Sequence, residues 1–130
     1  TYAVEVRNAA LLTADYAAAL KATGAVHCIN VTPGMPPPRV QQAMRDPSLP
    51  LVVRWLLAPG FAYDEARERF APFDQLVVPD VAVRRDLAAL VIGATSAGVP
   101  ATVIVNNKAE GSAPRSIEAL AAAIVDEPAF

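Results

Sequence analysis

The residues best suited to chemistry stand where an apolar run ends. Residues 103–105 are followed by Asn106 and Asn107, and a short polar turn reaches Gly111 before a helical pattern begins. In α/β proteins, ligands bind at the carboxyl ends of buried parallel strands. The two amides and the backbone N–H groups near the next helix could therefore bind an anion. The alternative is that both asparagines only shape the turn, because asparagine tolerates left-handed backbone and bonds its own backbone.

Charged residues occupy strand positions in two other segments. In a strand over residues 2–7, Glu5 and Arg7 share one face, and Arg54 lies within a strand over residues 51–57. A parallel sheet is usually covered on both sides, and isolated buried charges are costly, so we expect these three side chains to pair. In the functional interpretation the arginines hold a phosphate or carboxylate and Glu5 orients one guanidinium. In the structural interpretation the network only fixes strand register.

Two further asparagines, Asn8 and Asn30, follow or end strands and join the candidate ligand set. His27 and Cys28, the only histidine and cysteine, point to opposite faces of one strand and form neither a zinc site nor a Cys/His dyad. We expect His27 to face the helices as a structural histidine and Cys28 to be a small buried hydrophobe. Glu5 is the one candidate acid or base, although pairing with arginine lowers its proton affinity. The pattern indicates no metal site, and it leaves the cofactor unknown.

The composition bounds the class of protein. The chain has 130 residues and a net charge of −2, with 54% hydrophobic and only 18% charged residues. This length suits one domain over residues 1–130, and the acidic balance argues against nucleic acid as a partner. A single cysteine and the absence of a signal-peptide pattern fit a cytoplasmic protein. The uncharged span 87–105 contains Gly98 and Pro100, so we interpret it as helix, turn and buried strand, with no membrane role.

Strand and helix patterns alternate along the chain, which predicts an α/β fold with parallel strands. Strands are expected over residues 2–7, 25–31, 51–57 and 101–107, and the weaker run 75–78 is either a strand or a buried loop. Helices are expected over residues 14–23, 39–45, 63–70, 82–97 and 114–125. The arginines at positions 67, 69, 84 and 85 are mixed with acids, so we interpret them as belonging to solvated helix faces.

Three segments of the chain, taken together, carry a family resemblance. They are Ala3-Val4-Glu5-Val6-Arg7-Asn8, Val53-Arg54-Trp55 and Val105-Asn106-Asn107-Lys108-Ala109-Glu110-Gly111. Their order and spacing resemble the domain of unknown function 72 family, the YecE-like proteins. Members of that family carry Val-Glu-Phe-Arg-His, a hydrophobic-Arg-hydrophobic strand often followed by His-Gly, and Phe-Asn-Asn before an acidic or small residue and glycine. This chain departs from the pattern, because Asn8 and Leu56 or Leu57 replace the histidines and Asn30 stands where aspartate is frequent.

The resemblance implies the C-terminal half of a TIM-like barrel of eight β/α units. Four firm strands cannot close such a barrel, and an open sheet would expose an edge and an apolar inner face. We therefore expect that the chain is a fragment lacking the N-terminal barrel half, that two copies pair as a homo-oligomer, or that another chain supplies the first half.

The resemblance implies a fold more than a function, because the family has no established activity. Two functions stay open. One is an enzyme-like site for a small anionic ligand at the carboxyl ends of the strands, using the surviving family positions Glu5, Arg7, Arg54, Asn106 and Asn107. The other is a non-catalytic scaffold or assembly half-domain whose Glu/Arg/Asn cluster is structural.

Overall fold

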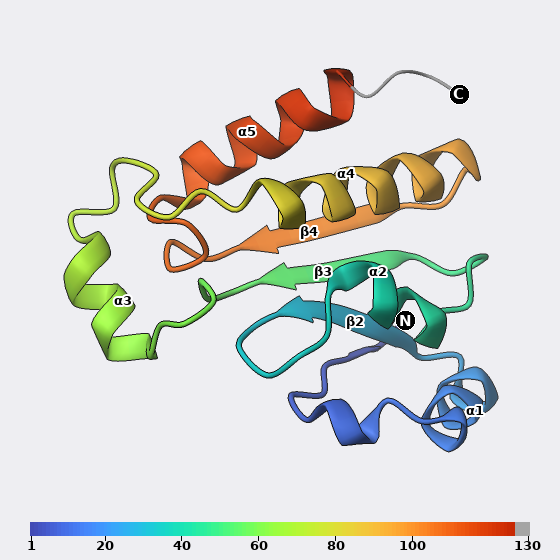
Figure 1. The fold of residues 1–130 in the computed structure, drawn as a ribbon. Helices are drawn as coiled ribbons and strands as arrows, with labels where there is room; N and C mark the ends of the chain where they lie inside the picture. The colour runs from blue at the N-terminus through green and yellow to red at the C-terminus, as the bar shows by residue number, and fades with distance from the viewer. Residues whose placement is uncertain (127–130) are drawn as a thin grey trace.

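The computed structural model describes residues 1–126 and shows strands alternating with helices (Figure 1). The strands are β1 (Ala3–Val4), β2 (Val26–Val31), β3 (Leu51–Trp55) and β4 (Ala101–Val105). The α-helices are α1 (Ala14–Thr23), α2 (Pro38–Gln41), α3 (Tyr63–Phe70), α4 (Val81–Ser96) and α5 (Ala113–Asp126), and the short 3-10 helices are η1 (Ala9–Leu11) and η2 (Gln42–Met44). Each strand pairs in parallel with the one before it, in the order β1-β2-β3-β4.

Local residue chemistry explains where the helices begin and end. Thr13 precedes α1 and its hydroxyl accepts a hydrogen bond from Tyr16 N, while Gly24 ends the helix with a φ of 67°. Such a left-handed terminus suits glycine because it lacks a Cβ. Asp80 caps α4 in the same way, accepting a hydrogen bond from Val83 N. Within residues 1–126, no helix is long and apolar enough to cross a membrane.

The predicted elements are confirmed, with shorter strands. The helices expected over 14–23 and 63–70 have those bounds, and the others differ by a few residues at their ends. The first strand is shorter than expected, because residues 5–7 continue beyond β1 without ladder pairing. Residues 75–78 form a loop rather than a strand, exposed at Gln75 and partly buried at 76–78, and the N–H groups of Val77 and Val78 donate to the carbonyl oxygen of Glu110.

One face of the sheet packs against helices and forms the main core. Ile29, Leu51, Val53 and Trp55 are almost completely buried, together with apolar residues of α4 and α5 such as Leu87, Leu90 and Leu120. Trp55 is therefore a core residue, as predicted. His27 shares this face and contacts α1 and α2, which confirms its predicted direction.

The opposite face of the sheet becomes more exposed from β2 to β4. The strand register places Asn30, Arg54 and Ile104 side by side on this face. Asn30 is fully buried, whereas half of the Ile104 surface is exposed. No part of residues 1–126 therefore covers this face of the sheet at β4.

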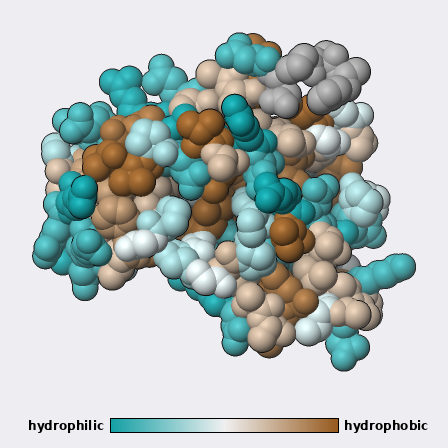
Figure 2. Space-filling view, in the orientation of Figure 1, coloured by the Kyte–Doolittle hydropathy of each residue, from teal (hydrophilic) through white to brown (hydrophobic). Residues whose placement is uncertain are grey.

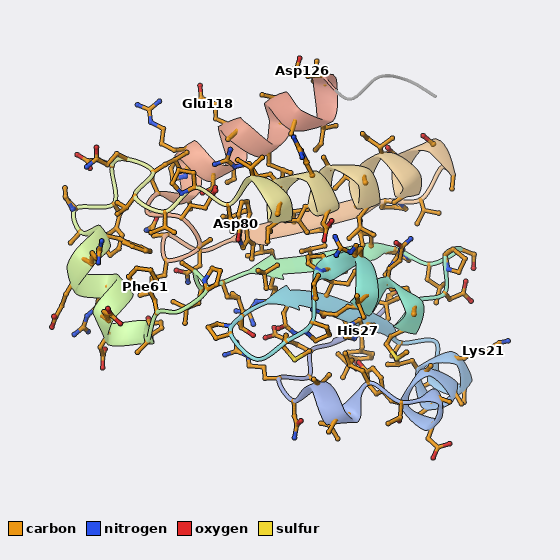
Figure 3. All side chains as sticks on the ribbon, viewed as in Figure 1. Lys21, His27, Phe61, Asp80, Glu118 and Asp126 are labelled. Atoms are coloured by element: carbon orange, nitrogen blue, oxygen red, sulfur yellow. The ribbon has the colours of Figure 1, made fainter. Side chains whose placement is uncertain are left out.

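A second, smaller core lies beyond the carboxyl ends of the strands. Ala58, Ala66 and Phe70 are buried there, and Phe61 and Phe73 pack against them. Figure 3 shows Phe61 near α3, far from His27, which lies between β2 and α1. Hydrophobic residues also reach the surface at this end, on the left of Figure 2, where α3 and the segment leading to α4 lie.

Candidate functional site

The carboxylate of Glu5 lies between the guanidinium groups of Arg7 and Arg54. Arg7 Nε is 2.7 Å from Glu5 Oε1, and Arg54 NH1, from β3, is 2.5 Å from Glu5 Oε2. The Glu5 side chain is 14% exposed, against 40% for Arg54 and 60% for Arg7. The predicted Glu/Arg pairing is confirmed, and the cluster is buried at its acidic centre and open at its basic ends.

This arrangement keeps Glu5 ionised. Burial opposes the negative charge, but the hydrogen bonds and charges of Arg7 and Arg54 outweigh it, so the pKa of Glu5 lies below its ordinary value of 4.5. A carboxylate that is ionised and occupied on both oxygens is suited to holding guanidinium groups. It is poorly suited to donating a proton near neutral pH.

A pocket of about 520 Å³ opens beside this cluster, at the carboxyl ends of the strands. Three of the predicted ligand residues line it, namely Arg7, Arg54 and Asn106. Tyr63 and Phe61, at the start of α3, form part of its wall. Neither aromatic residue was predicted from the sequence, although their position directly after a strand and its turn was a usable signal. Two guanidiniums against one carboxylate leave the cluster with a net charge of +1.

Two of the predicted asparagines use their side-chain oxygens to shape the chain after β4. Asn106 Oδ1 accepts a hydrogen bond from Lys108 N at 2.9 Å, and Asn107 Oδ1 accepts from Ala113 N, the first residue of α5, at 2.8 Å. The turn-forming alternative therefore describes these oxygens. Asn106 lines the pocket, and its amide nitrogen makes no hydrogen bond within residues 1–126.

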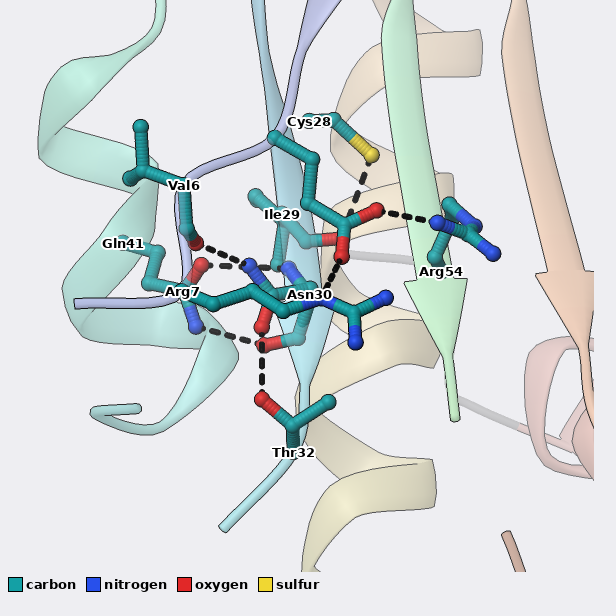
Figure 4. A network of polar contacts seen from close by, with 9 residues as sticks. Val6, Arg7, Cys28, Ile29, Asn30, Thr32, Gln41 and Arg54 are labelled. Atoms are coloured by element: carbon teal, nitrogen blue, oxygen red, sulfur yellow. Dashed lines mark hydrogen bonds and ion pairs between the residues drawn. The ribbon is translucent and has the colours of Figure 1, made fainter. Parts of the chain in front are cut away.

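The side chains of Asn8 and Asn30 also form hydrogen bonds with backbone groups. Asn8 Oδ1 accepts from Ala10 N at the start of η1. Asn30 is fully buried, its Nδ2 donates to Val6 O at 2.8 Å and its Oδ1 accepts from the Thr32 hydroxyl at 2.9 Å (Figure 4). Asn30 thereby fastens the segment that carries Glu5 and Arg7 to the end of β2.

A buried polar chain continues from Asn30 to the helices. Gln41 Oε1 accepts from Asn30 N at 3.1 Å and lies 3.2 Å from His27 Nε2, while His27 Nδ1 lies 2.9 Å from the Tyr16 hydroxyl. Burial lowers the pKa of His27 below 6.5, although the hydrogen bond that His27 donates to Gln41 opposes this shift, and the charge of Arg45 lowers the pKa further. Since Gln41 Oε1 can only accept, the neutral ring carries its proton on Nε2. His27 is structural, as predicted.

Cys28 lies on the opposite face of β2 from His27, as predicted, and is buried. Burial, helped by the charge of Glu5, raises the pKa of its thiol to about 11 despite the opposing charge of Arg54. The thiol is therefore protonated at neutral pH and is not an activated nucleophile.

A second ion pair was not predicted. Glu110 is fully buried, and both oxygens of its carboxylate face the guanidinium of Arg84, with Arg84 NH2 2.7 Å from Oε2. The backbone N–H of Asp80 donates to the same carboxylate. The interpretation of Arg84 as part of a solvated helix face is wrong, because its side chain is only 15% exposed and neutralises a buried charge.

The buried segment around Glu110 also contains Lys108 and Gly111. Lys108 Nζ lies 4.2 Å from the centre of the Tyr63 ring and 5.8 Å from that of Phe73. A Cβ on Gly111 would lie 2.5 Å from Gln75 O, so only glycine fits this approach to the 75–78 loop. The structure thus places Gly111 against this loop, and Gly111 is not among the residues that line the pocket beside Arg54.

The fold and the site define an α/β protein with parallel strands in chain order and a basic pocket at their carboxyl ends. Within the described residues, no group of three histidine, cysteine, aspartate or glutamate side chains is placed to hold a metal ion. The chain belongs to the family described as protein of unknown function DUF72, whose profile matches residues 1–129. This match confirms the resemblance seen in the sequence. No curated protein and no solved structure matches the chain.

Proposed function

We propose that this domain binds a small anionic ligand, a phosphate or a carboxylate, at the carboxyl ends of its strands. The observation that carries the proposal is that Glu5 occupies only part of each guanidinium, while both arginines line the pocket of about 520 Å³. Guanidinium groups with free N–H donors in a concave site bind oxyanions through paired hydrogen bonds.

Each residue has a distinct role in this proposal. Arg7 bonds Glu5 through Nε alone, so its two terminal nitrogens can grip an oxyanion with two parallel hydrogen bonds. Arg54 uses one terminal nitrogen on Glu5 and supplies its remaining N–H groups. The amide nitrogen of Asn106 adds a neutral donor, and Glu5 orients both guanidiniums without itself contacting the ligand.

A second candidate function, a non-catalytic scaffold or assembly half-domain, is favoured by a different observation. The side-chain oxygens of Asn30, Asn106 and Asn107 all bond the protein itself, as expected of a cluster that only fixes the strand ends. In this function, Glu5 ties β3 to the segment after β1 and no ligand is needed.

We also propose that the sheet is the C-terminal half of a TIM-like barrel. Parallel strands in chain order, with helices on one face and exposed Thr102 and Ile104 on the other, support this architecture. The exposed face would then meet either an N-terminal barrel half or a second copy of the chain. Light scattering of the purified chain distinguishes them, since a homo-oligomer doubles the mass whereas a missing half leaves a monomer that binds an apolar dye.

The anion proposal is tested by calorimetric titration and thermal melting with inorganic phosphate and with citrate. We expect at least one of these anions to bind the natural chain and to raise its melting temperature. Arg54→Met should abolish both effects, whereas Arg115→Met, at an exposed arginine paired with Glu118, should leave them unchanged. If neither anion binds the natural chain, or if Arg54→Met binds as well as the natural chain does, the scaffold function is correct instead.

A further inference from the structure

We infer that the ligand is a phosphate ester carrying a planar heteroaromatic ring, as in a nucleoside monophosphate, and that the ring stacks on Tyr63. This inference rests on the proposed anion site and specifies the rest of the molecule bound there. It is carried by an aromatic side chain that lines the same pocket as the two guanidiniums.

Tyr63 is placed and exposed as a stacking surface would be. It is the first residue of α3, it lines the pocket together with Arg7 and Arg54, and it is 58% exposed. Figure 1 shows α3 beyond the carboxyl ends of the strands, on the side where the pocket opens. An aromatic ring left this open next to a basic pocket offers a ligand a flat apolar contact beside its anionic one.

Lys108 fixes the Tyr63 ring from one side. Its Nζ lies 4.2 Å from the ring centre, within the range of a cation–π interaction. Lys108 is itself mostly buried, and its carbonyl oxygen accepts a hydrogen bond from Ala58 N at 2.9 Å. A ring has two faces, and one cation occupies one of them. The ring is therefore held in position before any ligand arrives, which reduces the entropy lost on binding.

The rest of the pocket suits such a ligand in charge and size. The guanidinium N–H groups that Glu5 leaves free offer more donors than the two oxygens of a carboxylate use, and the three oxygens of a phosphate ester suit them better. Phe61 adds a second apolar wall to the pocket. Its ring packs against that of Phe70, with 5.2 Å between the ring centres, and the guanidinium of Arg69 lies 5.5 Å from the centre of the Phe61 ring. A volume of about 520 Å³ exceeds what a lone phosphate needs and falls within the usual range for small-molecule sites.

The test compares four probes by titration calorimetry on the whole chain: adenosine monophosphate, ribose 5-phosphate, inorganic phosphate and adenosine. We expect the nucleotide to bind about tenfold tighter than ribose 5-phosphate, because stacking adds to the phosphate contacts. Tyr63→Leu should reduce nucleotide affinity to that of ribose 5-phosphate while leaving ribose 5-phosphate unchanged. Tyr63→Phe should keep the difference, and Tyr2→Leu, at an exposed tyrosine away from the pocket, serves as the matched control.

The outcomes separate this inference from the proposed function. If both phosphate esters bind equally, or if Tyr63→Leu keeps the tenfold difference, the stacking inference is wrong while the anion site stands. If adenosine binds as tightly as the nucleotide, the ring contact is correct and the phosphate contact is wrong, which overturns the inference as stated. If none of the phosphates binds, or if their binding survives Arg54→Met, the proposed function fails together with the inference.

Discussion

The molecule contains two carboxylate–guanidinium clusters that differ in depth and in how fully they are satisfied. Glu110 is fully buried, and its carboxylate is shared between Arg84 and the N–H of Asp80. Glu5 is nearly buried too, but its partners Arg7 and Arg54 are about half exposed and line a pocket. The same chemical groups are therefore enclosed in one region and open to a pocket in the other.

The difference shows what distinguishes a structural ion pair from a candidate binding site. In the Glu110 cluster the guanidinium lies largely out of water, so losing either partner would leave an uncompensated buried charge. In the Glu5 cluster the free N–H groups are solvated and cost little while no ligand is bound. We therefore expect mutations in the first cluster to affect stability and mutations in the second to affect binding.

The largest expected effect is that of Glu110→Gln. Removing this charge leaves Arg84 mostly buried without its partner, which should lower the free energy of unfolding by about 3–5 kcal/mol. Urea denaturation followed by circular dichroism measures the change. Glu118→Gln, in an exposed pair with Arg115, is the control and should cost about 0–0.5 kcal/mol. Equal losses in the two variants would contradict the distinction between the clusters.

A second prediction concerns the loop that carries Glu110. Gly111→Ala places a Cβ 2.5 Å from Gln75 O and 2.8 Å from Val77 N, at a φ of 128° that disfavours side chains. We expect a loss of about 2–4 kcal/mol, measured as a lower melting temperature. Gly93→Ala, inside α4 where the new methyl meets nothing within 4 Å, should instead stabilise by about 0.5–1 kcal/mol. A neutral result at Gly111 would mean that the 75–78 loop is free to move.

The third prediction concerns the Glu5 cluster and the contribution of Arg54 to the free energy of unfolding. Arg54→Met should lower the free energy of unfolding by about 1 kcal/mol or less, because the arginine is 40% exposed and water screens its pairing with Glu5. Urea denaturation in the absence of anions gives this value. A loss as large as that of Glu110→Gln would show that Arg54 belongs to a structural ion pair, and the two clusters would then not differ in this respect.

The smallest expected effect is a pH dependence. The pKa of Glu5 is lowered from 4.5 in the folded chain, so below pH 4.5 the unfolded chain takes up a proton that the folded chain does not. The stability that Glu5 provides is complete above pH 4.5 and is lost as the pH falls through its lowered pKa. Urea denaturation between about pH 6 and pH 3 should show the natural chain and Glu5→Gln converging at the acidic end. Parallel curves would show that Glu5 is not held by its arginines in solution.

Features governed by local chemistry could be predicted from the sequence. Thr13 and Gly24 fix both ends of α1, and the alternation of side chains along two strands predicted that Glu5 would meet Arg54. The faces of His27 and Cys28 follow from the same alternation. Strand ends were placed up to a few residues too late, because pairing stops where a neighbouring strand stops, which no single segment records.

Features that depend on distant segments could not be predicted. Glu110 and Arg84 are 26 residues apart, and nothing near either residue shows that the loop at 108–112 is buried. The same holds for Lys108, whose amine meets Tyr63 only after both loops fold over the strand ends. The sequence placed Asn30 at the end of a strand, but its hydrogen bond to the carbonyl oxygen of Val6 could be seen only in the folded structure.

Strand order has a consequence for how this chain is made. Each strand lies beside the one synthesised just before it, with a helical crossover between them, so every pairing is available as soon as its second strand leaves the ribosome. Because each strand pairs with its neighbour in the chain, the segment that must form a loop at each step is short, which favours fast folding. Such a sheet can be assembled progressively during translation, with each finished unit serving as the template for the next.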